Sequence, residues 1–169
     1  MQTMKVDPLQ LITKIISGGQ TGADRAGLDF AIKHDIPHGG WIPKGRKTEY
    51  GTLDLKYQLQ EMPTAEYAKR TEKNILDSDG TLIISHGLLS GGSALTREFA
   101  KKHKKPWIHI DMADLSLETA ADRLISWIER NDIKVLNVAG PRGSKDPTIY
   151  QATIDLLEKT LISSFSKAQ

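Results

Sequence analysis

Cysteine is absent from the 169-residue sequence. This absence excludes disulfides, thiolate catalysis, and zinc or iron–sulfur centres that are held by cysteine. Long apolar runs are also missing, because segments such as Leu82–Ile84 are far shorter than the about 20 residues that span a bilayer. Asp7 and Pro8 interrupt the N-terminal segment where a secretory peptide needs an unbroken apolar stretch. We therefore expect a cytoplasmic protein that does not cross a membrane.

A strong net charge is lacking as well, since the formal net charge is only +2. The one dense basic cluster, KKHKK at 101–105, falls where a helix is expected to end, and cations there complement the helix dipole. The charge thus argues against nucleic acid as a partner. The five histidines show no metal-ligand spacing, so no protein-ligated metal is expected. His86 alone stands at a strand end beside a glycine loop.

Apolar β-prone segments alternate with helical patterns along the whole chain. Such alternation predicts a mainly parallel five-stranded sheet with helices on both faces, which is an α/β, three-layer, Rossmann-like fold. The length suits a single domain over residues 1–169. Residues 117–128 and 149–161 show the spacing of amphipathic helices, and 43–53 reads as a long exposed connection. The expected strands are 12–17, 36–42, 81–85, 107–110 and 134–139.

A first glycine-bearing loop follows the strand at 12–17. Glycine permits a tight turn into a helix near Gly22, and the unpaired N–H groups of a helix N-terminus attract an anion such as phosphate. A sharp strand-to-helix turn favours glycine for purely structural reasons too, and the spacing matches neither standard nucleotide fingerprint. The candidate binding residues are Gly18, Gly19, Gln20, Thr21, Gly22 and Asp24.

The end of the second strand carries cations. A dinucleotide site needs an acidic residue at this point to hold the ribose, whereas this chain has Trp41, Lys44 and Arg46. These residues argue against NAD and for a second negatively charged group on the ligand, with Trp41 placed to lie against a heterocycle. The alternative is that Lys44 and Arg46 simply solvate a loop.

Two more glycine-rich loops follow later strands. One contains Gly91, Gly92, Ser93 and Thr96, and the other contains Gly140, Pro141, Arg142 and Ser144. In the second of these, Asp146 and Pro147 suit the N-cap and first position of the last helix. Ligands of parallel sheets bind at the carboxyl ends of the strands, where all three loops lie. Together they predict one site for a phosphorylated, nucleotide-like small molecule. Ser93 has no evident base nearby, and no G-x-S-x-G motif occurs, so a serine hydrolase is not indicated.

Five segments resemble the putative molybdenum carrier family, which belongs to a Rossmann-like superfamily with molybdenum cofactor carriers, lysine-decarboxylase-like phosphoribohydrolases and the DNA-processing protein A family. The resemblance implies a homo-oligomeric carrier of a phosphorylated heterocycle, with the molybdenum cofactor (molybdopterin) as the leading ligand and a purine nucleotide as the other. The segments are SGGQTGADRAGLDFA (17–31), GWIPKGR (40–46), RTEKNILDSDGTLII (70–84), GGSALTREFA (91–100) and NVAGPRGSKDPTIY (137–150).

The phosphoribohydrolases supply an alternative function. Their signature falls on residues 90–98, and the resemblance implies that Arg70 and Glu98 would assist cleavage of the N-glycosidic bond of a nucleoside monophosphate. Ala94 and Leu95 replace a glycine and a threonine of that signature. A third, weaker hypothesis is binding of single-stranded nucleic acid, by analogy with the DNA-processing relatives.

The same comparison suggests a circular permutation. The first strand and loop of those hydrolases resemble residues 138–150, which stand at the end of this chain. We therefore predict the strand order 2-1-5-3-4, in which the three glycine loops follow adjacent strands. The rival order 2-1-3-4-5 would leave the loop at 140–144 at the far edge of the sheet.

Overall fold

The computed structural model describes residues 11–163. Its centre is a five-stranded parallel sheet in the order β2-β1-β9-β7-β8. The last strand in the chain therefore lies between β1 and β7, which confirms the predicted order 2-1-5-3-4 and rules out its rival. The strands are β1 (Lys14–Ile16), β2 (His38–Gly39), β7 (Gly80–Ser85), β8 (Trp107–Asp111) and β9 (Val135–Ala139).

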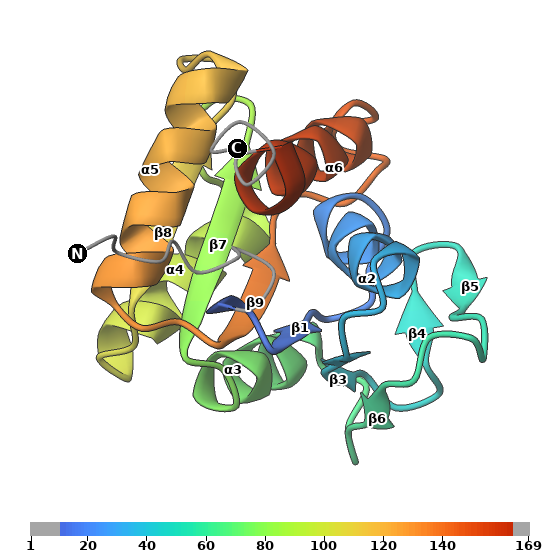
Figure 1. The fold of residues 1–169 in the computed structure, drawn as a ribbon. Coiled ribbons are helices and arrows are strands. Elements are labelled where there is room, and N and C mark those ends of the chain that lie inside the picture. The colour runs from blue at the N-terminus through green and yellow to red at the C-terminus, as the bar shows by residue number, and fades with distance from the viewer. Residues whose placement is uncertain (1–10, 164–169) are drawn as a thin grey trace.

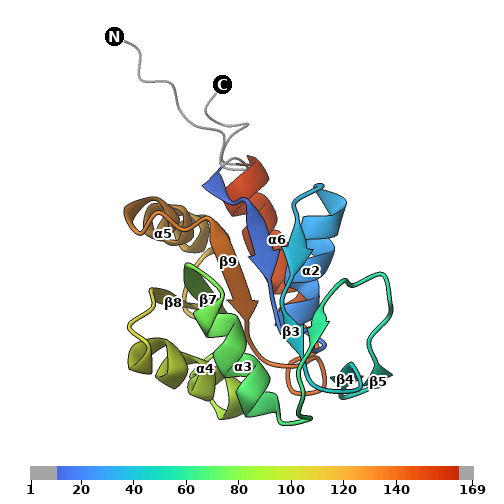
Figure 2. The same ribbon diagram turned by 90° about the horizontal axis from the view of Figure 1, so that it is seen from below.

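Helices cover both faces of the sheet, so the expected three-layer architecture is confirmed (Figure 1). On one face lie α2 (Ala23–Lys33), α5 (Leu117–Arg130) and α6 (Ile149–Glu158), the last continuing into a π-helical turn at Lys159–Ser163. On the other face α3 (Tyr67–Leu76) packs beside α4 (Gly91–Lys102), as Figure 2 shows.

The helix α5 illustrates how the sequence pattern fixes the packing. Its apolar residues recur at helical spacing, and Leu124 and Ile128 are buried against the sheet in the main core cluster. Ser116 begins the helix, since its side chain accepts a hydrogen bond from the Thr119 N–H at 3.2 Å. The basic cluster at 101–105 lies at the C-terminal end of α4, as expected.

The predicted second strand at 36–42 is interrupted. β2 joins the central sheet, whereas β3 (Trp41–Ile42) leaves it and pairs in parallel with β6 (Gln60–Glu61). Gly40 separates the two with φ of 122°, and a Cβ at this position would lie 2.2 Å from the carbonyl oxygen of Ser17. The interruption of the strand thus depends on Gly40, and the apolar pattern of the sequence does not mark this glycine as a strand break.

The connection at 43–53 is not the fully exposed loop that the sequence suggested. It contains a hairpin of β4 (Lys47–Thr48) and β5 (Gly51–Thr52), and Arg46 donates hydrogen bonds to the carbonyl oxygens of Leu53, Asp54 and Tyr57. The segment covers a second, smaller hydrophobic cluster, made of Leu28, Ile42, Leu53, Tyr57 and Leu59.

The start of α6 differs from the prediction by two residues. The helix begins at Ile149 with Thr148 at the N-cap, so Asp146 and Pro147 precede it. Asp146 nevertheless contributes at this end, because its Oδ1 accepts hydrogen bonds from the N–H and the Oγ1 of Thr148.

Candidate functional site

A cavity of about 510 Å³ opens where the loops after β1, β7 and β9 meet. Its size is typical of small-molecule sites, which occupy roughly 300–1,000 Å³. The permuted strand order brings these loops together, because the three strands are neighbours in the sheet. Residues of α3 complete the wall. The sequence-predicted residues that line the cavity are Gly18, Gln20, Asp24, Arg70, Gly92, Ser93, Thr96, Gly140, Pro141 and Arg142.

Two oppositely charged side chains form a buried wall of this cavity. Asp24 is 8% exposed and Arg70 is 7% exposed. Arg70 donates from Nη1 to the carbonyl oxygen of Gly18, and the backbone N–H of Gln20 donates to Oδ2 of Asp24 at 3.3 Å. Burial raises the pKa of Asp24 to about 6 although nearby Arg70 lowers it, and burial also lowers the pKa of Arg70. The cavity therefore contains a carboxylate whose desolvation the protein itself does not fully offset.

The N-terminus of α4 forms a more exposed part of the cavity lining. Ser90 stands at the N-cap without capping the helix, and within the described chain the first helical N–H with a partner is that of Ser93. Lys145 Nζ lies 3.4 Å from Ser90 Oγ, and a Cβ on Gly92 would meet nothing within 4 Å. An anion can thus reach unpaired helix donors with Lys145 and Arg142 nearby, both of them exposed.

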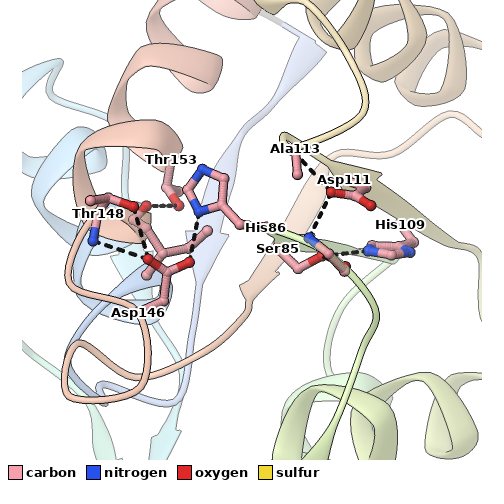
Figure 3. Close-up of polar contacts among 10 residues, drawn as sticks. Ser85, His86, His109, Asp111, Ala113, Asp146, Thr148 and Thr153 are labelled. Atoms are coloured by element: carbon pink, nitrogen blue, oxygen red, sulfur yellow. Dashed lines mark hydrogen bonds and ion pairs between the residues drawn. The ribbon is translucent and has the colours of Figure 1, made fainter.

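His86 is held by a carboxylate at the edge of the cavity. Its Nδ1 lies 2.7 Å from Oδ2 of Asp146, and Figure 3 shows the imidazole turned toward that side chain. Hydrogen bonds from His86 and Thr148 hold the pKa of Asp146 below its usual range although partial burial raises it. The Nε2 of His86 has no hydrogen-bond partner among residues 11–163.

Ser85 and His109 form a second polar pair beside it (Figure 3). The Ser85 Oγ lies 2.6 Å from the carbonyl oxygen of Gly87 and 2.7 Å from Nε2 of His109. A carbonyl only accepts, so the single hydroxyl proton goes to Gly87 and His109 donates from Nε2 to Ser85. His109 therefore does not act as a base toward Ser85, and the pair is structural.

Some predicted donors are used inside the protein. Thr21 Oγ1 donates to Oε1 of Glu49, and Ser144 donates to the same carboxylate from its N–H at 3.1 Å and from its hydroxyl at 2.5 Å. A Cβ on Gly22 would lie 2.3 Å from the carbonyl oxygen of Pro141. Thr21, Gly22 and Ser144 consequently hold the first and third glycine loops and the β4–β5 hairpin together instead of lining the cavity.

The chain is similar to known proteins in sequence and in overall structure. The sequence model of the circularly permutated YpsA SLOG family matches residues 15–161. The chain belongs to this family. The crystal structure of a putative molybdenum carrier protein from Syntrophus aciditrophicus SB is 67% identical in sequence, with 90% of this chain and 96% of that chain covered and a TM-score of 0.89. No curated protein matches.

Residues predicted from the second strand exit lie outside the cavity lining in this family member. Trp41 donates from Nε1 to Oδ2 of Asp77 at 2.6 Å, and Lys44 is exposed. Tyr67 of α3 is the aromatic side chain among the lining residues, and its ring centroid lies 5.4 Å from Cζ of Arg70. Arg46 donates hydrogen bonds to the backbone carbonyl oxygens of the segment at 53–57.

Glu98, the second residue of the hydrolase alternative, also lies outside the lining. Its side chain is 57% exposed and contacts Arg97 and Lys101. Gly19 and Gly91 are absent from the lining as well, although Gly91 adjoins Lys145, whose Nζ would lie 2.9 Å from a Cβ at that position.

Sequence reasoning missed the contribution of α3 and the charged residues after Ser144. Spacing along the chain does not show that α3 packs against the first loop, and only the resemblance marked Arg70. The missed lining residues with polar or aromatic side chains are Tyr67, Thr71, Asn74, Ser85, Ser90, Asn137, Lys145, Asp146 and Thr148.

Metal ligation and membrane crossing find no support in the part of the chain that is described. Over residues 11–163, no three or more His, Asp or Glu side chains gather as metal ligands would. Within the same range, no helix has the length and apolar character needed to span a bilayer.

Proposed function

We propose that the protein binds and carries a phosphorylated heterocycle, with the molybdenum cofactor (molybdopterin) as the leading ligand and a purine nucleotide as the other. The observation that carries the proposal is a cavity whose lining combines exposed cations near a helix N-terminus with buried hydrogen-bonding groups. The relative that is described as a putative molybdenum carrier protein supports the same role.

The cation-lined side suits the phosphate. The N-terminal turn of α4 would donate from the N–H of Gly92, which lines the cavity, while Lys145 and Arg142 supply positive charge. A helix N-terminus contributes about 0.3–2 kcal/mol to an anion, and each hydrogen bond to a charged group about 1.5–3 kcal/mol. Even if these contributions are not fully additive, their sum reaches the binding free energy of a micromolar site, which is about 8 kcal/mol. The heterocycle would lie toward Tyr67 and the buried wall.

Binding is favoured over hydrolysis by the placement of the side chains. Glu98 lies outside the cavity lining, and its side chain forms exposed ion pairs with Arg97 and Lys101. We therefore do not extend the proposal to cleavage of nucleoside monophosphates.

The proposal is tested by calorimetric titration of the full-length protein with molybdopterin and with purine mononucleotides. We expect micromolar binding of at least one of them, weakened about 10- to 100-fold in the Lys145→Ala and Arg142→Ala variants, because each loses a charged hydrogen bond. Lys69→Ala, on the exposed surface of α3, is the matched control and should leave the affinity unchanged. Absence of binding to every compound would refute the proposal.

A further inference from the structure

Asp24 and Arg70 form the buried wall of the cavity but have no assigned partner on a ligand. Both side chains line the cavity and are less than a tenth exposed. Arg70 uses one N–H group on the carbonyl oxygen of Gly18, and a guanidinium has five. The cavity wall thus presents a carboxylate acceptor beside guanidinium donors.

This pair does not behave as a purely structural ion pair. A carboxylate that is neutralised by a close guanidinium has a depressed pKa, whereas burial raises the pKa of Asp24 to about 6 despite Arg70. The two side chains make no direct ion pair in the described structure, since the only bond of the guanidinium is to Gly18. A ligand edge that offers N–H donors to Asp24 and an acceptor to Arg70 would satisfy both groups at once.

We propose, building on the function proposed above, that Asp24 and Arg70 recognise the edge of the 2-amino-4-oxopyrimidine ring that guanine and pterin share. On this edge a ring N–H and the exocyclic amino group are adjacent donors, which the carboxylate of Asp24 accepts together. The neighbouring carbonyl oxygen accepts from Arg70. Hypoxanthine lacks the amino donor, and adenine has an acceptor nitrogen in place of the ring N–H, so its lone pair would face the carboxylate.

The test is a calorimetric titration of the full-length protein with GMP, IMP and AMP, which share the phosphate and ribose. We expect GMP to bind at least about 10-fold more tightly than IMP, since one hydrogen bond to a charged group is lost. AMP should bind more weakly than IMP. In Asp24→Asn the difference between GMP and IMP should disappear, while Asp122→Asn, on the exposed surface of α5, should retain it.

A second pair of compounds tests the same inference if the site accepts pterins but not purines. Pterin and 4-oxopteridine differ only in the 2-amino group, so the same preference is expected for pterin. In the wild-type protein, equal affinities for GMP, IMP and AMP together with equal affinities for pterin and 4-oxopteridine would overturn this inference. A preference for AMP would overturn it too. Either result would leave the proposed function standing. Failure of every nucleotide and pteridine to bind would overturn both. Both outcomes are read from the wild-type protein, so neither depends on the folding of a variant.

Discussion

Replacing Glu49 with alanine tests how the glycine loops are held in place. The Glu49 carboxylate accepts hydrogen bonds from Thr21 and, twice, from Ser144, and Arg142 Nε lies 3.9 Å away. A hydrogen bond to a charged group is worth about 1.5–3 kcal/mol, but Ser144 is exposed and regains water when the carboxylate is removed. We therefore expect Glu49→Ala to lower the free energy of unfolding by about 2–4 kcal/mol, which is less than the sum of the bonds.

The assay is thermal and urea unfolding of the full-length protein. For a domain of this size the loss corresponds to a fall in Tm of roughly 5–15 °C. Glu129→Ala is the control, because Glu129 is exposed on α5 and its side chain makes no hydrogen bond or ion pair in the described structure, so its effect should stay within about 0.5 kcal/mol. A Glu49→Ala protein as stable as the control would refute the assigned role of the carboxylate.

The same carboxylate gives the effect a pH dependence. Partial burial raises the pKa of Glu49, but hydrogen bonds from Ser144 and Thr21, together with Arg142, hold it below its ordinary value of 4.5. A carboxyl group whose pKa is lower in the folded state than in the unfolded state stabilises the fold. This stabilisation is fully present at a pH above the unfolded-state pKa. The stability difference between wild type and Glu49→Ala should therefore be full at neutral pH and shrink as the pH falls through the folded-state pKa.

Two further substitutions test the loop packing and the buried carboxylate. Gly22→Ala should cost roughly 3 kcal/mol or more in urea unfolding, because φ is 79° and the new Cβ would lie 2.3 Å from the Pro141 carbonyl oxygen. Gly45→Ala, at φ of 81° with nothing within 4 Å, should cost only about 1–2 kcal/mol, and equal costs would contradict the packing argument. Asp24, with its pKa raised from 3.8 to about 6, binds its proton more tightly when folded. The stability of wild type relative to Asp24→Asn should thus fall as the pH rises from about 4 to 6, by on the order of 3 kcal/mol, and no change would show that Asp24 is not desolvated.

Much of the fold was predictable because its signals are local. The amphipathic spacing of α5 and the apolar strands follow from residues that are close in sequence. The position of β9 between β1 and β7 is not local, and it was predicted only through the resemblance of residues 138–150 to the first strand and loop of the phosphoribohydrolases.

The site was predicted in part. Glycine loops mark strand ends, so Gly18, Gly92 and Gly140 were found, and parallel strand geometry places them together. Whether a loop donor faces a ligand or another loop depends on tertiary partners. Thr21 and Ser144 meet Glu49 from a hairpin that the sequence did not reveal.

The predicted residues after the second strand lie outside the cavity lining for the same reason. Trp41 and Arg46 find partners in Asp77 and in backbone carbonyl oxygens, since the chain turns away from the main sheet at Gly40. Two lining side chains of these types were not predicted. Tyr67 belongs to α3, which has no glycine signal, and Lys145 directly follows the loop of Gly140 and Ser144.

The most direct test of the shared cavity is a crystal structure of the full-length protein with bound molybdopterin or GMP. The phosphate should lie within hydrogen-bonding distance of the Gly92 N–H and Lys145 Nζ, with the heterocycle between Tyr67 and Asp24. A ligand bound elsewhere on the protein, or a phosphate placed at Lys44 and Arg46, would contradict the account.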